Sequence, residues 1–277
     1  MSADSLPYTL LILLVELAVG SLAVTVFFDQ RRMVTRGYVQ MGAMVVVPTA
    51  LLALLVAFGV RVEAEIDGYF FSTGWFDPFR WSLVMFLVTS AAFMVAAFAG
   101  RRDVGLMLGA AGIAVGVVVL VLLAGLVAPP AWSFPGVIAS MLAAALALGG
   151  SLMAMSWGHW YLTNSGLPKE PLEQMSLLVV GALGLQLVLL VVGVIAPVRE
   201  VPLTESAFGV SLGANPAFWL RVAVGLLFPL FLSVLAWKAA SIRGMMSATG
   251  LLYIATGAVL AGEVLARGLL FATGITL

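Results

Sequence analysis

Residues 8–28, YTLLILLVELAVGSLAVTVFF, form an apolar run in which Glu16 is the only Asp, Glu, Lys or Arg. A helix needs about 20 mostly apolar residues to cross the hydrocarbon core of a bilayer. Comparable runs recur along the chain, at 8–28, 39–60, 80–99, 104–128, 135–158, 174–197, 217–239 and 246–272. The alternating pattern of membrane β-strands is absent. The sequence therefore predicts an all-α integral membrane protein with eight transmembrane helices.

The composition agrees with this class of protein. Of 277 residues, 63% are hydrophobic and 9% are charged, whereas soluble domains carry about 25% charged residues. The chain contains no cysteine, which excludes disulfides, thiolate metal sites and cysteine-ligated iron–sulfur clusters. Its net charge is zero, so nothing favours a nucleic-acid partner. The first segment, MSADSLP, lacks a basic region, and we expect the first apolar run to be a retained span rather than a cleaved signal.

The basic residues predict how the chain is oriented. Eight of the thirteen lie on one side of the predicted spans, in loops or at a span end, and they are Arg31, Arg32, Arg36, Arg101, Arg102, Lys169, Lys238 and Arg243. The side richer in Lys and Arg is usually cytoplasmic. Both termini are then extracytoplasmic, together with the two longest loops, 61–79 and 198–216. These loops carry acidic and aromatic residues, which suit either docking of a partner or an interfacial belt.

The two halves of the chain share an ordered set of matches. The segment VGSLAVTVFFDQ (19–30) aligns with GGSLMAMSWGHW (149–160), which places Asp29 opposite His159. DPFRW at 77–81 aligns with NPAFW at 215–219, and Arg102, Gly109 and Gly116 align with Arg243, Gly250 and Gly257. Four spans in each half give both halves the same orientation. We therefore predict two parallel four-helix repeats, residues 1–128 and 129–277, with small residues allowing close helix packing.

Two polar residues lie well inside predicted spans. Ionisable residues at membrane depth are costly and merit a functional hypothesis. Glu16 must therefore be protonated, paired, or facing a polar cavity; both proton exchange with a ligand and a structural hydrogen bond fit. Gln186 is a neutral donor and acceptor, and such residues more often join helices than bind ligands.

Four further charged residues lie toward the extracytoplasmic side. Glu263 and Arg267 are four residues apart in the last span, so they share a helix face and can pair. Such a pair near the outer surface suits either a structural ion pair or a ligand site. Arg80 and Arg221 begin the third and seventh spans, where we expect their side chains to reach back to the interface.

The only histidine of the chain, His159, lies between Trp157 and Trp160, with Tyr161 next. We expect it at the cytoplasmic end of the fifth span, within an aromatic belt. A neutral imidazole there could donate to a quinone carbonyl or relay a proton, and an interfacial anchor is the alternative. Ligation of haem by two histidines of this chain is impossible. No P-loop, Rossmann fingerprint, zinc motif or nucleophile elbow occurs, so the sequence predicts neither catalytic residues nor a metal site.

Two segments resemble a known family. FWLRVAVGLLFPLFLSVLAW (218–237) has a basic residue followed by a G-x-x-x-P pattern at Gly225 and Pro229, and GAVLAGEVLARGLLF (257–271) has Gly-Glu and then Arg before Phe. With the eight-span plan, these segments are similar to the NrfD-like superfamily, the membrane-anchor subunits of polysulfide reductase and dimethyl sulfoxide reductase. The likeness covers about a third of the chain, mainly in the carboxyl-terminal half.

The resemblance implies a haem-free subunit in a bacterial or archaeal plasma membrane. It would bind menaquinone or ubiquinone and exchange electrons with iron–sulfur and catalytic subunits docked on its extracytoplasmic face. The candidate quinone-binding or proton-exchange residues are Glu16, His159, Gln186, Glu263 and Arg267, at apparently different depths. Two other functions remain open. Repeated bundles also occur in secondary transporters, and a membrane scaffold subunit needs no ligand.

Overall fold

The structure, a computed structural model, describes residues 5–66, 69–128, 134–164, 166–195 and 212–274. In this part of the chain eight helical stretches are long and apolar enough to cross a membrane. They are α1 (Leu6–Gln30), α2 (Arg36–Gly59), η1 (Thr73–Trp75) with α3 (Phe76–Ala99), α4 (Arg102–Val127), α5 (Phe134–Thr163), α6 (Glu170–Ile195), α7 (Pro216–Leu220) with η4 (Arg221–Leu227) and α8 (Phe228–Ser241), and α9 (Met245–Thr273). The predicted all-α, multi-pass membrane protein is confirmed.

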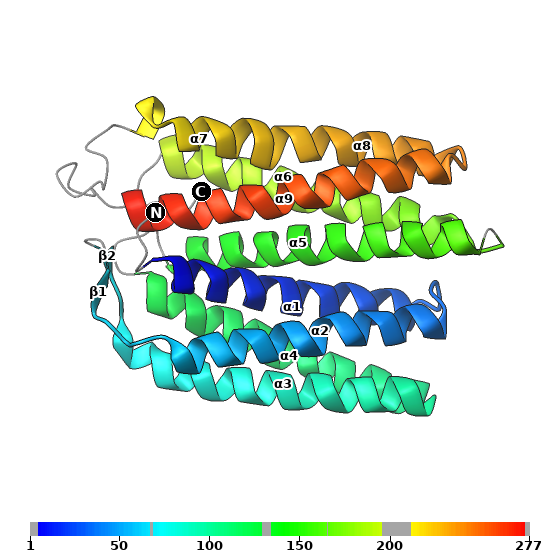
Figure 1. Ribbon diagram of the computed structural model, residues 1–277, viewed down its shortest axis with the longest axis horizontal. Helices are drawn as coiled ribbons and strands as arrows, with labels where there is room; N and C mark the ends of the chain where they lie inside the picture. Colours follow the sequence, from blue (N-terminus) through cyan, green and yellow to red (C-terminus); the bar gives the residue numbers. More distant parts are fainter. Residues whose placement is uncertain (1–4, 67–68, 129–133, 165, 196–211, 275–277) are drawn as a thin grey trace.

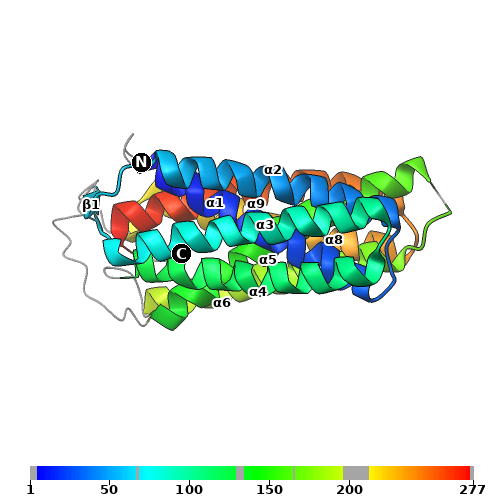
Figure 2. The same cartoon turned by 90° about the horizontal axis from the view of Figure 1, so that it is seen from below.

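The helices run along one long axis (Figures 1 and 2) and pack as two rings of four. In the first ring α1 contacts α2 and α4, while α3 contacts the same two helices. In the second ring α5 contacts α6 and α9, while α8 contacts the same two. The rings meet where α1 contacts α5, α4 contacts α5, and α1 contacts α9. This repeated set of neighbours is the arrangement expected of two four-helix repeats; the proposed boundary adjoins residues 129–133, which lie outside the described residues.

The contact between the rings depends on glycine. A Cβ atom added to Gly149 of α5 would lie 2.1 Å from the carbonyl carbon of Gly20 in α1. A Cβ atom added to Gly20 would overlap the backbone of Ala145. Small residues let two membrane helices approach to backbone contact, which replaces the hydrophobic driving force that lipid does not supply. The predicted packing role of these glycines therefore holds at the centre of the molecule.

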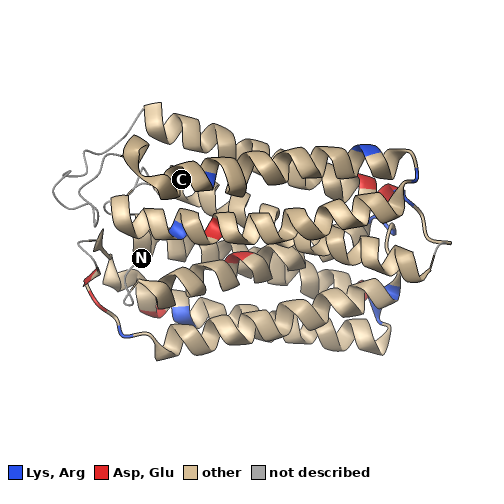
Figure 3. Cartoon of the chain, turned by 45° about the horizontal axis from the view of Figure 1, so that its top comes forward, with Lys and Arg blue, Asp and Glu red and all other residues tan. Residues whose placement is uncertain are grey.

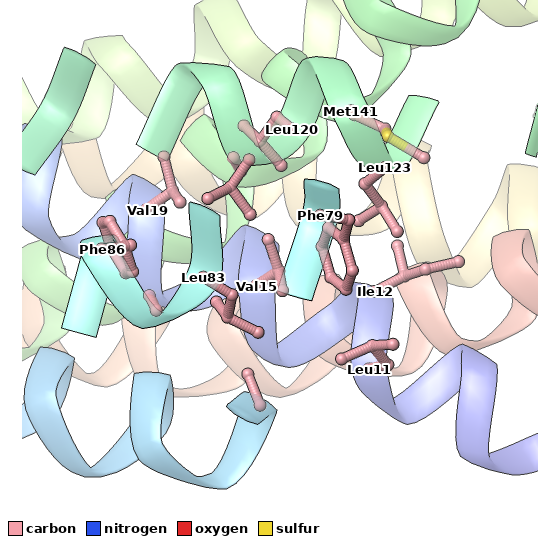
Figure 4. Close-up of a cluster of buried hydrophobic side chains, with 14 of the residues drawn as sticks. Leu11, Ile12, Val15, Val19, Phe79, Leu83, Phe86, Leu120, Leu123 and Met141 are labelled. Atoms are coloured by element: carbon pink, nitrogen blue, oxygen red, sulfur yellow. The ribbon is translucent and has the colours of Figure 1, made fainter. Parts of the chain in front are cut away.

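The first ring has an apolar interior. Figure 4 shows side chains of α1, α3, α4 and α5 packed against one another, among them Val15, Leu83, Phe86 and Leu120. All four are fully buried. Large side chains on the outside of both rings, such as Leu55, Val188 and Phe231, are exposed and suited to contact lipid.

The loop between the second and third spans is partly ordered. Strand β1 (Glu65–Ile66) pairs antiparallel with β2 (Tyr69–Phe70). The third span begins at Thr73 rather than at residue 80, because Asp77 and Pro78 interrupt the apolar run without ending the helix. Tyr69 and Phe71 are buried. Phe71 packs against Tyr8 and Phe271, and Tyr69 packs against Phe271, at ring-centroid distances of 4.9–5.9 Å.

Two aromatic residues in this part of the chain are exposed. Phe70 and Trp75 face outward, so they are the ones still available for the predicted docking role. Most of the other predicted docking loop, including Arg199, Glu200 and Glu205, lies outside the described residues.

Candidate functional site: a buried charge cluster

Five polar side chains meet inside the bundle although they come from four separate helical segments. They are Glu16 of α1, Gln186 of α6, Arg221 of η4, and Glu263 and Arg267 of α9. None is more than 5% exposed. We call this group the buried charge cluster. Two carboxylates and two guanidinium groups make it formally neutral, which is the condition under which charges are tolerated at membrane depth.

Arg267 joins the two carboxylates. Its Nη2 atom lies 2.5 Å from Oε1 of Glu16 and 3.5 Å from Oε2 of Glu263. The second distance confirms that Glu263 and Arg267, one helical turn apart, share a face and pair. The first pair links α1 of the first ring to α9 of the second.

Arg221 and Gln186 complete the network around Glu263. The Nη2 atom of Arg221 lies 3.1 Å from Oε1 of Glu263 and donates to Oε1 of Gln186 at 3.2 Å. The amide nitrogen of Gln186 donates to the same Glu263 oxygen at 2.8 Å. Gln186 therefore uses both its donor and its acceptor and fixes α6 against α9.

Three buried polar atoms of the cluster have no hydrogen-bond partner among the described residues. They are Oε2 of Glu16 and the Nε atoms of Arg221 and Arg267. An unpartnered polar group in a dry interior costs about 1–3 kcal/mol, and more when it is charged. The cluster thus balances its charge but leaves one carboxylate oxygen of Glu16 free to accept.

The position of Arg221 depends on a local change of helix type. Residues Arg221–Leu227 form a π-helix, in which the N–H of Phe228 donates to the carbonyl of Ala223. Pro229 lacks an N–H and cannot bond the carbonyl of Gly225; the Nη1 atom of Arg221 lies 3.5 Å from that carbonyl oxygen instead. Short π segments inside helices frequently occur at functional sites.

Glycines also bring η4 close to α9 beside the cluster. A Cβ atom added to Gly262 would lie 2.4 Å from the Cα of Gly225 and 2.9 Å from Nη1 of Arg221. The absence of both side chains allows the Arg221 guanidinium to reach Glu263 of the neighbouring turn. Gly225 and Gly262 are therefore packing residues of the site.

The cluster lies along the helices, several residues from their ends. Glu16 is ten residues from the start of α1 and Arg267 is six residues from the end of α9, or about 15 Å and 9 Å along the axis. Figure 3 shows this small group of charges part-way along the helices, apart from those at the ends. Arg267 is thus within two turns of the end of α9, and the expected position of Glu263 and Arg267 toward the extracytoplasmic side stays a prediction.

The structure unites four of the five candidate residues. Glu16, Gln186, Glu263 and Arg267 are in direct or shared contact, so the expectation that the candidates lie at different depths was wrong for these four. Sequence reasoning missed Arg221, which was expected to reach the interface but is 1% exposed. The feature that could have indicated its burial is its position: Arg221 is a charged residue in an apolar segment, five residues after the helix begins at Pro216.

His159 stands apart from the cluster. It is exposed near the end of α5, and its Nδ1 atom lies 2.9 Å from the hydroxyl oxygen of Tyr253 in α9. The helix continues to Thr163, so His159 lies inside its last turns. Its neighbour Trp157, by contrast, is fully buried against Tyr38 of α2.

Arg80 lies near the start of α3 and keeps its side chain at the end of the span. It is partly exposed and donates to the carbonyls of Ala57 and Val60 at 2.8 and 3.2 Å. Its guanidinium also lies over the rings of Phe58 and Phe76. The two arginines expected to behave alike therefore differ, since Arg80 anchors a helix end and Arg221 enters the core.

Comparison of the chain with protein-family models, with curated proteins and with solved structures found no match.

Proposed function

We propose that this chain is a quinone/quinol-interacting membrane-anchor subunit of a respiratory oxidoreductase, and that the buried charge cluster is its proton-exchange element. The observation that carries the proposal is the Glu16 carboxylate. One of its oxygens is held by Arg267, while the other is buried and has no partner among the residues that the structure describes. The resemblance of the last two spans to the NrfD-like superfamily supports the same function.

A comparison of the two rings argues against a purely structural role for these charges. In the alignment of the two halves, Arg221 corresponds to Leu83, and Glu263 and Arg267 correspond to Leu122 and Leu126. These leucines pack in or against the apolar core of the first ring. A four-helix ring of this design therefore packs without charges at these positions. Buried ion pairs add little net stability. Because packing does not require the ion pairs of the second ring, a functional role explains them better.

Each residue of the cluster has a definable part in this chemistry. A bound quinol would supply two electrons, for the iron–sulfur partner, and two protons, which Glu16 would take up one at a time. Glu16 accepts a proton at Oε2, and Arg267 holds its carboxylate in place through Oε1. Glu263 remains paired with Arg221 and Gln186. A proton that leaves Glu16 restores its charge opposite Arg267, so the cluster returns to neutrality.

The test measures bound quinone and quinol oxidation in the same preparations. The complex is purified in detergent from native membranes, its lipid-soluble fraction is extracted, and quinone is quantified per protein chain. We expect co-purified quinone and quinol oxidation in the native protein. Glu16→Gln, although less stable, should still fold and assemble, and should lose at least tenfold in quinol oxidation per assembled complex. The matched control is Glu173→Gln, a carboxylate of partial exposure paired with Lys169, which should oxidise quinol at the native rate.

Two results would contradict the proposal. One is the absence of quinone from the native complex together with no binding of added quinol. The other is quinol oxidation by Glu16→Gln at the rate of the Glu173→Gln control. Full activity after conservative replacement of every cluster residue would favour the scaffold function instead.

One observation favours a proton-coupled transporter as the second candidate. Interrupted helices beside buried charges are typical of transporter sites, and η4 interrupts the seventh span at the cluster, whereas α3 of the first ring is continuous. Uptake of a solute by proteoliposomes containing the chain alone, driven by a proton gradient, would support that candidate. Quinone bound to the complex without any such uptake supports the anchor subunit.

A further inference from the structure

A second polar site lies at the opposite end of the first ring. A cavity of about 290 Å³ opens among the end of α1, the start of α2, the end of α3 and the start of α4. Its lining includes Asp29, Arg36, Val39, Phe93, Arg102 and Gly105. We call it the α1–α4 end pocket. Its volume is just below that of typical small-ligand sites, which begin at about 300 Å³.

Two arginines at this pocket are held in place by hydrogen bonds and retain unused N–H donors. The Nε atom of Arg102 lies 3.0 Å from Oδ1 of Asp29, and its Nη2 donates to the Asp29 carbonyl. Arg36 donates from Nε and Nη2 to the carbonyls of Ala97 and Phe98, at 3.3 and 2.5 Å. Within the described residues, the Nη1 groups of both arginines have no protein acceptor. Two positioned guanidinium groups against one carboxylate favour an anion.

The deeper wall of the pocket is apolar. Val39, Phe93, Ala96 and Ala97 are buried and line it. Gly105 keeps the space open, because a Cβ atom added there would meet only the Ala96 Cβ, at 3.9 Å. The site therefore joins cationic groups at a helix end to an apolar interior. A free inorganic anion would leave that apolar wall without a partner.

The geometry points to an anionic phospholipid as the ligand of the α1–α4 end pocket: its phosphate binds Arg36 and Arg102, and the first part of an acyl chain or its glycerol enters between Val39 and Phe93. The surroundings add to the attraction, since Arg31, Arg32 and Arg101 lie at the same end of α1 and α4. Basic pockets between transmembrane helices bind acidic headgroups in this way. This site is independent of the buried charge cluster and of the function proposed for it.

Binding is measured by native mass spectrometry of the full chain in detergent. The probes are dioctanoyl phosphatidylglycerol, dioctanoyl phosphatidylcholine and inorganic phosphate. We expect phosphatidylglycerol to bind more tightly than phosphatidylcholine and not to be displaced by equimolar phosphate. Arg36→Gln with Arg102→Gln should weaken phosphatidylglycerol binding about 30-fold, since each basic residue near an anionic lipid contributes about 1 kcal/mol. The matched control, Arg243→Gln, removes an exposed arginine from the second ring and should leave binding unchanged.

A second pair of variants tests the pocket without changing charge. Gly105→Leu fills the space and should abolish binding, whereas Gly105→Ala fits and should retain it. Equal affinity for the two lipids, or equal losses in the Arg243→Gln and double-arginine variants, would overturn the proposal. Native affinity in Gly105→Leu would do the same, because it would place the lipid outside the pocket. Displacement of phosphatidylglycerol by equimolar phosphate would show that the arginines bind a free anion and would overturn the proposal of a lipid ligand.

Discussion

Removal of one partner of the Glu16–Arg267 pair is the most direct test of the buried charge cluster. In Arg267→Met, two carboxylates face a single guanidinium, that of Arg221, and Glu16 loses its partner at 2.5 Å. Breaking a buried ion pair from one side destabilises by about 3–5 kcal/mol, because the remaining charge is buried and uncompensated. We expect the free energy of unfolding to fall by this amount. Glu16→Gln leaves one positive charge in excess and should be destabilising in the same way.

The double variant separates pairing from side-chain loss. Glu16→Gln with Arg267→Met leaves Gln186, Arg221 and Glu263, which form a neutral group with 2.8–3.2 Å contacts. Two unit charges about 4 Å apart attract by about 4 kcal/mol at an effective dielectric constant of 20. Measured couplings between contacting residues reach about 3 kcal/mol. We therefore expect the double variant to be about 2–3 kcal/mol more stable than the sum of the single changes predicts.

The assay is equilibrium unfolding in mixed micelles of increasing SDS content, followed by tryptophan fluorescence. Arg243→Met, which removes an exposed arginine, is the control and should stay within about 0.5 kcal/mol of the native protein. Additive effects of the two single changes would refute the reasoning. A fall in the free energy of unfolding of less than about 1 kcal/mol in each single variant would also refute it, because the charge that remains would then not be buried without a partner.

The remaining predictions concern helix packing and the histidine. Gly262→Ala should destabilise by about 1–3 kcal/mol in the same SDS unfolding assay, because its Cβ would lie 2.4 Å from the Cα of Gly225. Gly257→Ala, on the same helix with open space around it, should not lower stability, and a loss equal to that of Gly262→Ala would contradict the packing argument. His159→Phe removes an exposed hydrogen bond to Tyr253 and should change stability by less than about 1 kcal/mol and leave quinol oxidation intact. A tenfold loss of oxidation would instead place His159 in the reaction.

The sequence by itself determined the class of fold. The number of spans and their membrane character follow from hydropathy, which depends only on local composition. The i, i+4 spacing of Glu263 and Arg267 fixed their shared face, because helical periodicity is also local. The sequence also indicated which polar residues to consider as site candidates, because few charged residues occur in the apolar runs.

Only the tertiary structure decided which of these residues meet. Glu16 and Arg267 are 251 positions apart, and their contact depends on the way α1 packs against both α5 and α9. Arg221 was assigned to the interface because it lies near the start of its span. Its position in the sequence does not show whether its side chain points toward the interface or into the bundle. The π segment and the close approach of Gly225 to Gly262 turn its side chain inward. Lipid solvates every apolar helix face equally well. Which helices become neighbours therefore depends on close packing and polar contacts, and hydropathy contains no information on either.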